Sequence, residues 1–318
     1  MKKNPRIIFF GTPDFAVPSL ERLVQSNYQV VAVVTAPDKP AGRGLKEKFS
    51  PVKISAQKMG LTVLQPVSFK DPVFFAQLSS YTPDLQIIIA FRMLPRNIWS
   101  LPPLGTFNLH ASLLPQYRGA APINHALMNG EEVSGLTTFM LNEKIDEGKI
   151  LLLKKEPVGP LETAGELHDR LMQTGADLVL KTLEGIINRS LHEVSQEALL
   201  PDQIPLKAAP KIFREDCRIN WNQDVMKVHN LIRGLSPVPG AFTEFRVQDG
   251  SLQVLKIYRS IPEKGESIHE PGTFLSDGQT FIKVAVKNGY IHVIALQLSG
   301  RKTMYTADFL RGAGHLFD

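Results

Sequence analysis

The sequence is poor in cysteine, with Cys217 alone among 318 residues. One thiol excludes an intramolecular disulfide, and it also excludes a metal site built from several cysteines. Proteins with so little cysteine are typical of a reducing compartment. No histidine pattern accompanies Cys217, so we expect a packed or surface thiol rather than a nucleophile.

Long apolar runs are absent too, since no stretch approaches the roughly eighteen residues that a membrane-spanning helix needs. The opening segment MKKNPRIIFFGTPDF has basic residues and a short apolar run, but no small-residue cleavage site. We therefore expect a soluble cytoplasmic protein that does not enter a membrane. Most histidines are scattered without metal-ligand spacing, and we expect no metal at His125, His168, His192, His229, His269, His292 or His315.

The sequence also lacks a dinucleotide fingerprint. The turn GTPDFAVPSL stands where that fingerprint would be, but Gly11 is followed by Thr12 and Pro13, and no G-x-G-x-x-G appears. A nicotinamide cofactor therefore loses its main support. The formal charge is +5 and the pI is about 9.2. This mild basic excess is compatible with a phosphate-bearing partner, but it falls short of a nucleic-acid signature.

The residues that are present indicate a globular protein with two domains, since 43% are hydrophobic and 21% are charged. In the N-terminal half, apolar runs of strand length alternate with helical patterns. Runs such as Val30–Val34 and Ile87–Ala90 are typical of parallel strands that are covered on both faces. We expect a doubly wound, mostly parallel α/β sheet, whose functional crevice lies at the carboxyl ends of the strands.

The composition changes near residue 190, where a polar stretch contains Pro201, Pro205 and Pro210. Such a stretch is typical of a linker. Beyond it, short strand patterns with turn signals predict a small β-barrel, for which an OB-like barrel is the leading candidate. We expect one domain at 1–189, a linker at 190–208 and a second domain at 209–318.

Polar groups cluster in the segment FNLHASLLPQYRGAAPI. If residues 107–111 form a strand, Asn108 and His110 project from the same face at its end. Asp146 lies in NEKIDEG, a turn-rich connection between two strand-like stretches. Considered alone, these groups also fit a polar strand end that the local backbone satisfies and an exposed acid at a hairpin tip.

Longer motifs favour a functional role for these residues over a purely structural one. The strings NLHASLLPQYRGAAPI, KIDEG, GTPDFAVPSL, APDKPAGRG, SPVK and LSPVPGAF closely resemble the methionyl-tRNA formyltransferase family over essentially the whole chain. The resemblance implies transfer of the formyl group of 10-formyltetrahydrofolate to the α-amino group of methionyl initiator tRNA, for translation initiation. It also implies that 1–189 is a formyltransferase catalytic domain and that 209–318 is an OB-like domain that binds tRNA.

The resemblance further implies roles for individual residues. The family's catalytic residues fall on Asn108, His110 and Asp146. Its folate pocket falls on the SLLP turn and on the loop after the preceding strand, that is, on Ser112, Leu113, Leu114, Pro115, Ile89, Phe91 and Met93. A glycine-containing basic loop is implied to bind tRNA phosphates through Lys39, Arg43, Lys46 and Lys48. From charge alone, this loop also fits a solvated surface segment.

The sequence departs from the commonest family pattern at four residues. Phe91 and Arg92 stand where a tyrosine-glycine pair is usual, so the sequence leaves the local shape of the pterin pocket undetermined. Ala111 replaces the more usual glycine or proline, and Glu147 stands where threonine is general. None of these changes removes a reacting group.

The expected chemistry explains the residue types. Attack of a neutral amine on a formyl carbonyl develops negative charge on oxygen and positive charge on nitrogen. We hypothesise that Asn108 and His110 stabilise the oxyanion, while Asp146 orients His110 and favours its charged form.

Two other functions fit parts of the sequence. One is a folate-dependent N-formyltransferase that acts on a small amine, such as a nucleotide-linked amino sugar. The other is a non-catalytic RNA-binding protein of the same fold, against which the intact Asn108, His110 and Asp146 speak. We expect a monomer, because no extended apolar helix is left unassigned.

Overall fold

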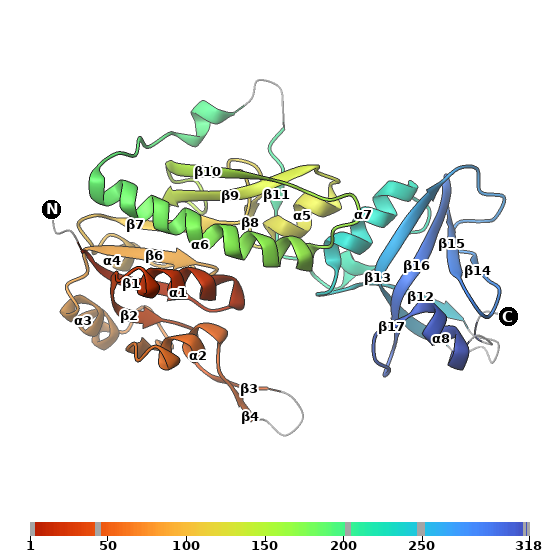
Figure 1. The fold of residues 1–318 in the computed structure, drawn as a ribbon, viewed down its shortest axis with the longest axis horizontal. Helices are drawn as coiled ribbons and strands as arrows, with labels where there is room; N and C mark the ends of the chain where they lie inside the picture. The colour runs from red at the N-terminus through yellow and green to blue at the C-terminus, as the bar shows by residue number, and fades with distance from the viewer. Residues whose placement is uncertain (1–3, 42–45, 201–204, 247–251, 314–315, 317–318) are drawn as a thin grey trace. The chain divides into compact units, whose positions relative to one another are not determined.

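The computed structural model describes residues 4–41, 46–200, 205–246, 252–313 and 316, with the side chains of 39–41, 46–48 and 246 outside the description (Figure 1). The chain divides into two compact units. The first unit comprises residues 1–119, 135–156 and 168–207. The second unit comprises residues 120–134, 157–167 and 208–318.

A seven-stranded sheet forms the centre of the first unit, in the order β10-β9-β7-β6-β1-β2-β5. Its strands are β1 (Arg6–Gly11), β2 (Gln29–Val34), β5 (Val63–Leu64), β6 (Leu85–Ile89), β7 (Thr106–His110), β9 (Val133–Met140) and β10 (Ile150–Pro157). The five strands from β7 to β5 pair in parallel, whereas β9 is antiparallel to β7. The predicted mostly parallel sheet is confirmed.

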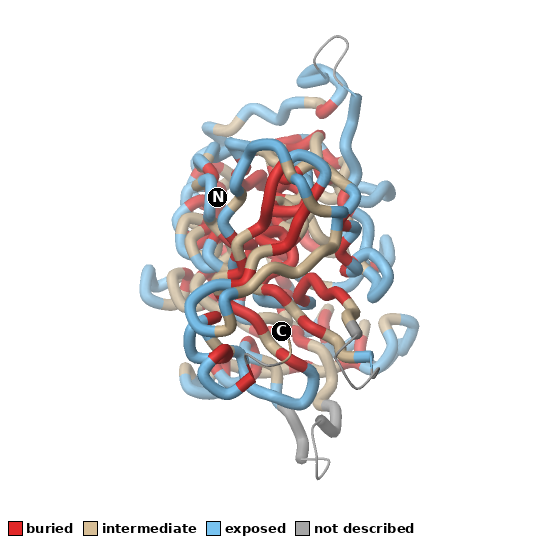
Figure 2. Tube along the Cα trace, turned by 90° about the vertical axis from the view of Figure 1, so that its right-hand side faces the viewer, coloured by how far each residue is buried: buried red, intermediate tan, exposed pale blue. Residues whose placement is uncertain are grey.

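Helices cover this sheet. They are η1 (Asp14–Ala16), α1 (Val17–Gln25), α2 (Pro51–Lys58), α3 (Pro72–Ser80), α4 (Arg96–Trp99) and α6 (Ala164–Asn188). Helices α2 and α3 begin at side-chain caps: Ser50 accepts the Lys53 N–H, and Asp71 accepts the Val73 N–H. Covered on both faces, strands β1, β2 and β6 are mostly buried. Figure 2 marks the buried residues of the chain in red.

Short elements complete the chain: β3 (Lys39–Ala41), β4 (Lys46–Lys48), β8 (Arg118–Gly119), η2 (Gln196–Leu199), β11 (Ala208–Ala209) and η3 (Glu215–Cys217). Within the described residues, no helix combines the length and the apolar character that crossing a membrane requires.

An antiparallel sheet organises the second unit, in the order β12-β13-β16-β15-β14, with β17 also paired to β16. The strands are β12 (Ala241–Arg246), β13 (Leu252–Lys264), β14 (Phe274–Ser276), β15 (Ile282–Val286), β16 (Gly289–Leu298) and β17 (Met304–Tyr305). Helices α5 (Pro122–Met128), α7 (Val225–Leu235) and α8 (Thr306–Ala313) belong to the same unit. The predicted small β-domain is confirmed, while its OB-like character stays a prediction.

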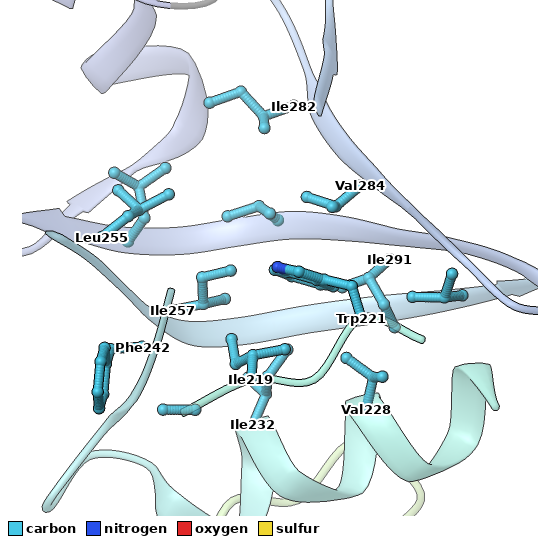
Figure 3. Close-up of a cluster of buried hydrophobic side chains, with 14 of the residues drawn as sticks. Ile219, Trp221, Val228, Ile232, Phe242, Leu255, Ile257, Ile282, Val284 and Ile291 are labelled. Carbon is cyan, nitrogen blue, oxygen red and sulfur yellow. The ribbon is translucent and has the colours of Figure 1, made fainter. Parts of the chain in front are cut away.

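The core of the second unit lies between α7 and the antiparallel sheet (Figure 3). The side chains drawn there include Ile219, Trp221, Val228, Ile232, Phe242, Leu255, Ile257, Ile282, Val284 and Ile291. Trp221 buries its ring and donates its Nε1–H to Thr243 Oγ1 at 3.0 Å, so its polar atom is satisfied. Burial of each large apolar side chain contributes roughly 1.5–3 kcal/mol.

The second unit takes in residues that the sequence pattern assigned to the N-terminal domain. Helix α5 packs on α7, where the Asn124 amide donates to the Gly234 carbonyl at 2.7 Å. A methyl group on Gly234 would lie 2.6 Å from Met128, so this contact needs glycine. Residues distant in sequence therefore share one core, which composition alone does not reveal. The division at 1–189, 190–208 and 209–318 stays a prediction.

Buried His229 of α7 links the pieces of the second unit. Its Nε2–H donates to the Pro160 carbonyl at 3.1 Å, and its Nδ1 lies 2.9 Å from Ser260 Oγ. Burial, with a smaller contribution from the charge of Arg233, lowers the pKa of His229 below its usual 6.5.

This histidine should make the second unit less stable in acid. Because the folded-state pKa is lowered, the unfolded chain binds more protons as the pH falls through about 6.5, and stability is lost there. The free energy of unfolding can be measured by urea titration at about pH 7.5 and about pH 5.5, with Trp221 fluorescence as the probe in a Trp99→Phe background. The loss of this free energy between the two pH values should be smaller for His229→Gln than for the chain with His229. An unchanged acid loss in His229→Gln would contradict the assignment, and exposed His192→Gln is the matched control.

Candidate active site

Strand β7 carries Asn108 and His110 between two hydrogen-bonded neighbours. Asn108 is paired with Ile88 of the parallel strand β6, and His110 is paired with Thr137 of the antiparallel strand β9. Leu109, between them, is 3% exposed and faces α6, because a methyl group on Gly175 of that helix would lie 2.8 Å from it. Asn108 and His110 therefore project from the opposite face, as the alternation predicts.

The Asn108 side chain holds an unsatisfied polar atom. Its Oδ1 is buried and has no hydrogen-bond partner in the part of the chain that the structure describes. A buried amide oxygen without a partner costs about 1–3 kcal/mol. Such atoms are rare in folded proteins and are expected where a bound molecule completes the hydrogen bonding.

His110 is oriented by the backbone of the following turn. The side chain is 6% exposed, and its Nε2 lies 2.9 Å from the Tyr117 carbonyl. A carbonyl only accepts, so Nε2 carries the proton and, in the neutral ring, Nδ1 does not. This contact could not be predicted from sequence, because it depends on the left-handed backbone of Tyr117, whose φ is 61°.

Asp146 lies beside His110 without a hydrogen bond to it. The distance from His110 Nδ1 to Asp146 Oδ2 is 3.8 Å, which suits an ion pair once the ring is protonated but exceeds a hydrogen bond. Oδ2 accepts the Gly119 N–H at 3.0 Å. The Asp146 side chain is only 15% exposed, so it is not an exposed acid at a hairpin tip.

A buried polar network supports the loop that carries Asp146. Gln196, which is 3% exposed, bonds to the carbonyls of Asp146 and Gly148 and to the guanidinium of Arg118. Arg118 Nη1 also lies 3.3 Å from Glu147 Oε1. A methyl group on Gly148 would come within 1.6 Å of the Met140 carbonyl oxygen, so only glycine fits there. Sequence analysis missed Gln196, since it lies in the segment assigned to the linker.

The SLLP turn is held by hydrogen bonds and packing contacts within the first unit. Ser112 is 1% exposed and donates its hydroxyl to the Gln116 carbonyl at 2.7 Å. Leu114 is 2% exposed and packs with Phe139 and Ile150. Pro115 is buried as well, whereas Leu113 is half-buried. Of the four side chains predicted to bind folate here, Leu113 is the most accessible.

The loop after β6 contains the other predicted folate residues. Ile89 is fully buried in the sheet, and the Phe91 ring packs against Phe10 and Phe69 at centroid distances of 5.6 and 6.0 Å. Met93 is 74% exposed, so it is the one of the three whose side chain is open to a ligand.

Arg92 fastens this loop. Its guanidinium lies 4.0 Å from the centroid of the Phe69 ring, and it donates to the carbonyls of Pro66 and Val67. Desolvation lowers the pKa of Arg92, yet the side chain keeps these compensating contacts. The Phe91–Arg92 pair, where the sequence departs from the usual family pattern, therefore has a structural role in the loop.

The predicted tRNA-binding side chains fall outside the description. Arg43 lies outside the described residues, and Lys39, Lys46 and Lys48 lie on β3 and β4, of which the structure describes the backbone alone. Among the described residues, no group of three or more His, Cys, Asp or Glu residues is arranged to hold a metal.

Known proteins match both parts of the chain. The family profile described as "Formyl transferase" matches residues 5–183, and that described as "Formyl transferase, C-terminal domain" matches residues 211–314. A methionyl-tRNA formyltransferase of Phocaeicola vulgatus is 52% identical over 314 residues, 98% of this chain and 96% of that one. Its counterpart in Bacteroides thetaiotaomicron is 48% identical over 315 residues, with the same coverage. The chain belongs to the methionyl-tRNA formyltransferase family.

Membership of the formyltransferase family makes the protein an enzyme and confirms the family, fold and enzyme class predicted from sequence. Solved structures agree on the fold. An N-formyltransferase from Helicobacter canadensis in complex with folinic acid and dTDP-3-aminofucose has a TM-score of 0.66 at 20% identity, covering 91% of this chain and 98% of that one. HypX from Aquifex aeolicus in complex with tetrahydrofolic acid has a TM-score of 0.63 at 18% identity, covering 99% and 48%.

The contact between His110 Nε2 and the Tyr117 carbonyl predicts the tautomer of His110. Because Nε2 is committed to the Tyr117 carbonyl, the neutral ring should carry its proton on Nε2 and leave Nδ1 free to accept one. Long-range ¹H–¹⁵N spectra of imidazole-labelled protein, assigned with His110→Gln, should show the Nε2–H form at high pH. A dominant Nδ1–H form would contradict the geometry.

Proposed function

We propose that this enzyme transfers the formyl group of 10-formyltetrahydrofolate to the α-amino group of methionyl initiator tRNA, giving N-formylmethionyl-tRNA for translation initiation. The observation that carries the proposal is identity of 46–52% with methionyl-tRNA formyltransferases across 98% of the chain. That identity spans both units, and Asn108, His110 and Asp146 are all present.

A reduced folate as formyl donor is supported from two directions. Proteins of the same fold are described in complex with folinic acid and with tetrahydrofolic acid. In this chain, the unsatisfied Oδ1 of Asn108 is a buried acceptor, which an N–H group of a bound molecule would satisfy. Leu113 and Met93, with the backbone of the SLLP turn, are proposed to wall the pterin ring.

The geometry favours a division of labour within the site. The Asn108 amide is proposed to donate to the oxygen on which negative charge develops, since an amide offers N–H groups without titration. The unprotonated Nδ1 of His110 is proposed to accept the proton that the attacking amine loses. This role replaces the oxyanion stabilisation hypothesised from the sequence, because the Nε2–H is already bonded to the Tyr117 carbonyl. Protonated His110 then faces Asp146 at 3.8 Å, and the carboxylate stabilises the imidazolium. The ring is proposed to give this proton to N10 of the folate as the bond between N10 and the formyl carbon breaks, which releases tetrahydrofolate.

The tRNA is proposed to contact the basic segment of residues 39–48, which includes β3 and β4. Lys39, Arg43, Lys46 and Lys48 place four positive charges within ten residues. Phosphate contacts of this kind are independent of base sequence and would hold the acceptor stem near the site.

We further propose that the enzyme acts in the cytoplasm as a monomer.

A small amine is the less favoured acceptor. Formyltransferases that are described as acting on sugars share the fold, but at 17–20% identity, far below the 46–52% of the tRNA-formylating relatives. The second unit also corresponds to the family's C-terminal domain over residues 211–314.

Substitution of Asn108 tests both the reaction and the proposed donor. Formyl transfer from 10-formyltetrahydrofolate should be observed with methionyl initiator tRNA and not with uncharged tRNA or with a nucleotide-linked amino sugar. Asn108→Ala should lower turnover by roughly 10²-fold or more, because one donor to the developing oxyanion is lost.

Asn188→Ala, at the exposed end of α6, is the matched control and should keep normal turnover. Near-normal turnover of Asn108→Ala would remove the donor assignment. Transfer to the amino sugar, or tRNA binding without any transfer, would contradict the proposed function.

A further inference from the structure

We infer that Gln196 is a positioning residue for the reaction, which holds the Asp146 loop in its working geometry. This inference rests on the proposed function. Gln196 begins η2, lies fifty residues beyond Asp146 in the chain, and is 3% exposed. Its side chain is buried, and its amide is fully used in hydrogen bonds within the first unit.

The donor end of the Gln196 amide fixes the backbone of the loop. Nε2 donates to the carbonyl of Asp146 at 2.8 Å and to the carbonyl of Gly148 at 2.8 Å. Asp146 has a φ of 53°, a left-handed conformation that a side chain seldom adopts without support. The two bonds bracket this residue, so they set the direction in which its side chain leaves the backbone.

The acceptor end of the Gln196 amide binds the side chain of Arg118, which is adjacent to the residue that binds the Asp146 carboxylate. Oε1 accepts from Arg118 Nε at 3.0 Å and from Arg118 Nη2 at 2.7 Å. Arg118 directly precedes Gly119, whose N–H donates to Asp146 Oδ2 at 3.0 Å. Gln196 therefore bonds both to the backbone around Asp146 and to the side chain of Arg118, the residue next to the N–H that binds the Asp146 carboxylate.

Glutamine is the residue type that this arrangement requires. Glutamate has the same shape and accepts from Arg118, but its carboxylate offers no donor to the two carbonyls and repels them. Methionine has a similar length but offers neither the N–H donor nor the carbonyl acceptor of the glutamine amide. Because Asp146 faces Nδ1 of His110 at 3.8 Å, a shift of the loop by about 1 Å is expected to slow turnover by as much as 10²-fold.

Kinetics of Gln196→Glu and Gln196→Met test this inference, with full-length protein, methionyl initiator tRNA and 10-formyltetrahydrofolate. Both variants should lose between about tenfold and 10²-fold in kcat. The KM for each substrate should change by less than about threefold, because neither substrate contacts a side chain that is buried in this way. Gln77→Glu, at an exposed position of α3, is the matched control and should behave as the unchanged enzyme.

The outcomes separate this inference from the proposed function. An unchanged enzyme without formyl transfer would refute the function itself. An active enzyme in which Asn108→Ala is impaired and Gln196→Glu keeps a normal kcat would refute the role of Gln196 alone. A fall in kcat that is matched by an equal rise in KM would overturn the inference, because it would show that Gln196 serves general stability. Loss of the folded state in both variants would overturn it for the same reason.

Discussion

The position of β7 between β6 and β9 is the constraint on which the site depends. Hydrogen bonds on both edges fix the register, so the alternation of the strand decides which side chains face α6 and which face away. Leu109 is committed to the face packed by Gly175. Asn108 and His110 must then share the other face, and a slip by one residue would exchange the apolar side chain for the two polar ones.

Around that strand, the site is assembled by satisfying backbone carbonyls. The Tyr117 carbonyl orients His110, and Gln196 takes the carbonyls of the Asp146 loop. These groups lie in loops, where the regular ladder cannot pair them, and burial makes each unpaired group costly. The polar contacts that hold the fold here are therefore the same contacts that aim the reacting side chains.

Much of this architecture could be predicted from sequence, because it follows from patterns that are local in the chain. Continuous apolar runs gave the parallel sheet, and the spacing of Asn108 and His110 gave their common face. Contacts between distant segments could not be predicted in this way. Gln196 and the Tyr117 carbonyl carry no pattern, because their roles arise from loop conformations and from burial. The packing of α5 in the second unit was missed for the same reason.

The most direct test of the account is a structure of the enzyme with folinic acid, a stable formylated folate. We expect the formyl oxygen to lie within about 3 Å of the Asn108 side-chain amide and the formyl carbon to face Nδ1 of His110. A folate that is bound with its formyl group away from both residues would contradict the account, because no group on this face of β7 could then act on the reacting carbonyl.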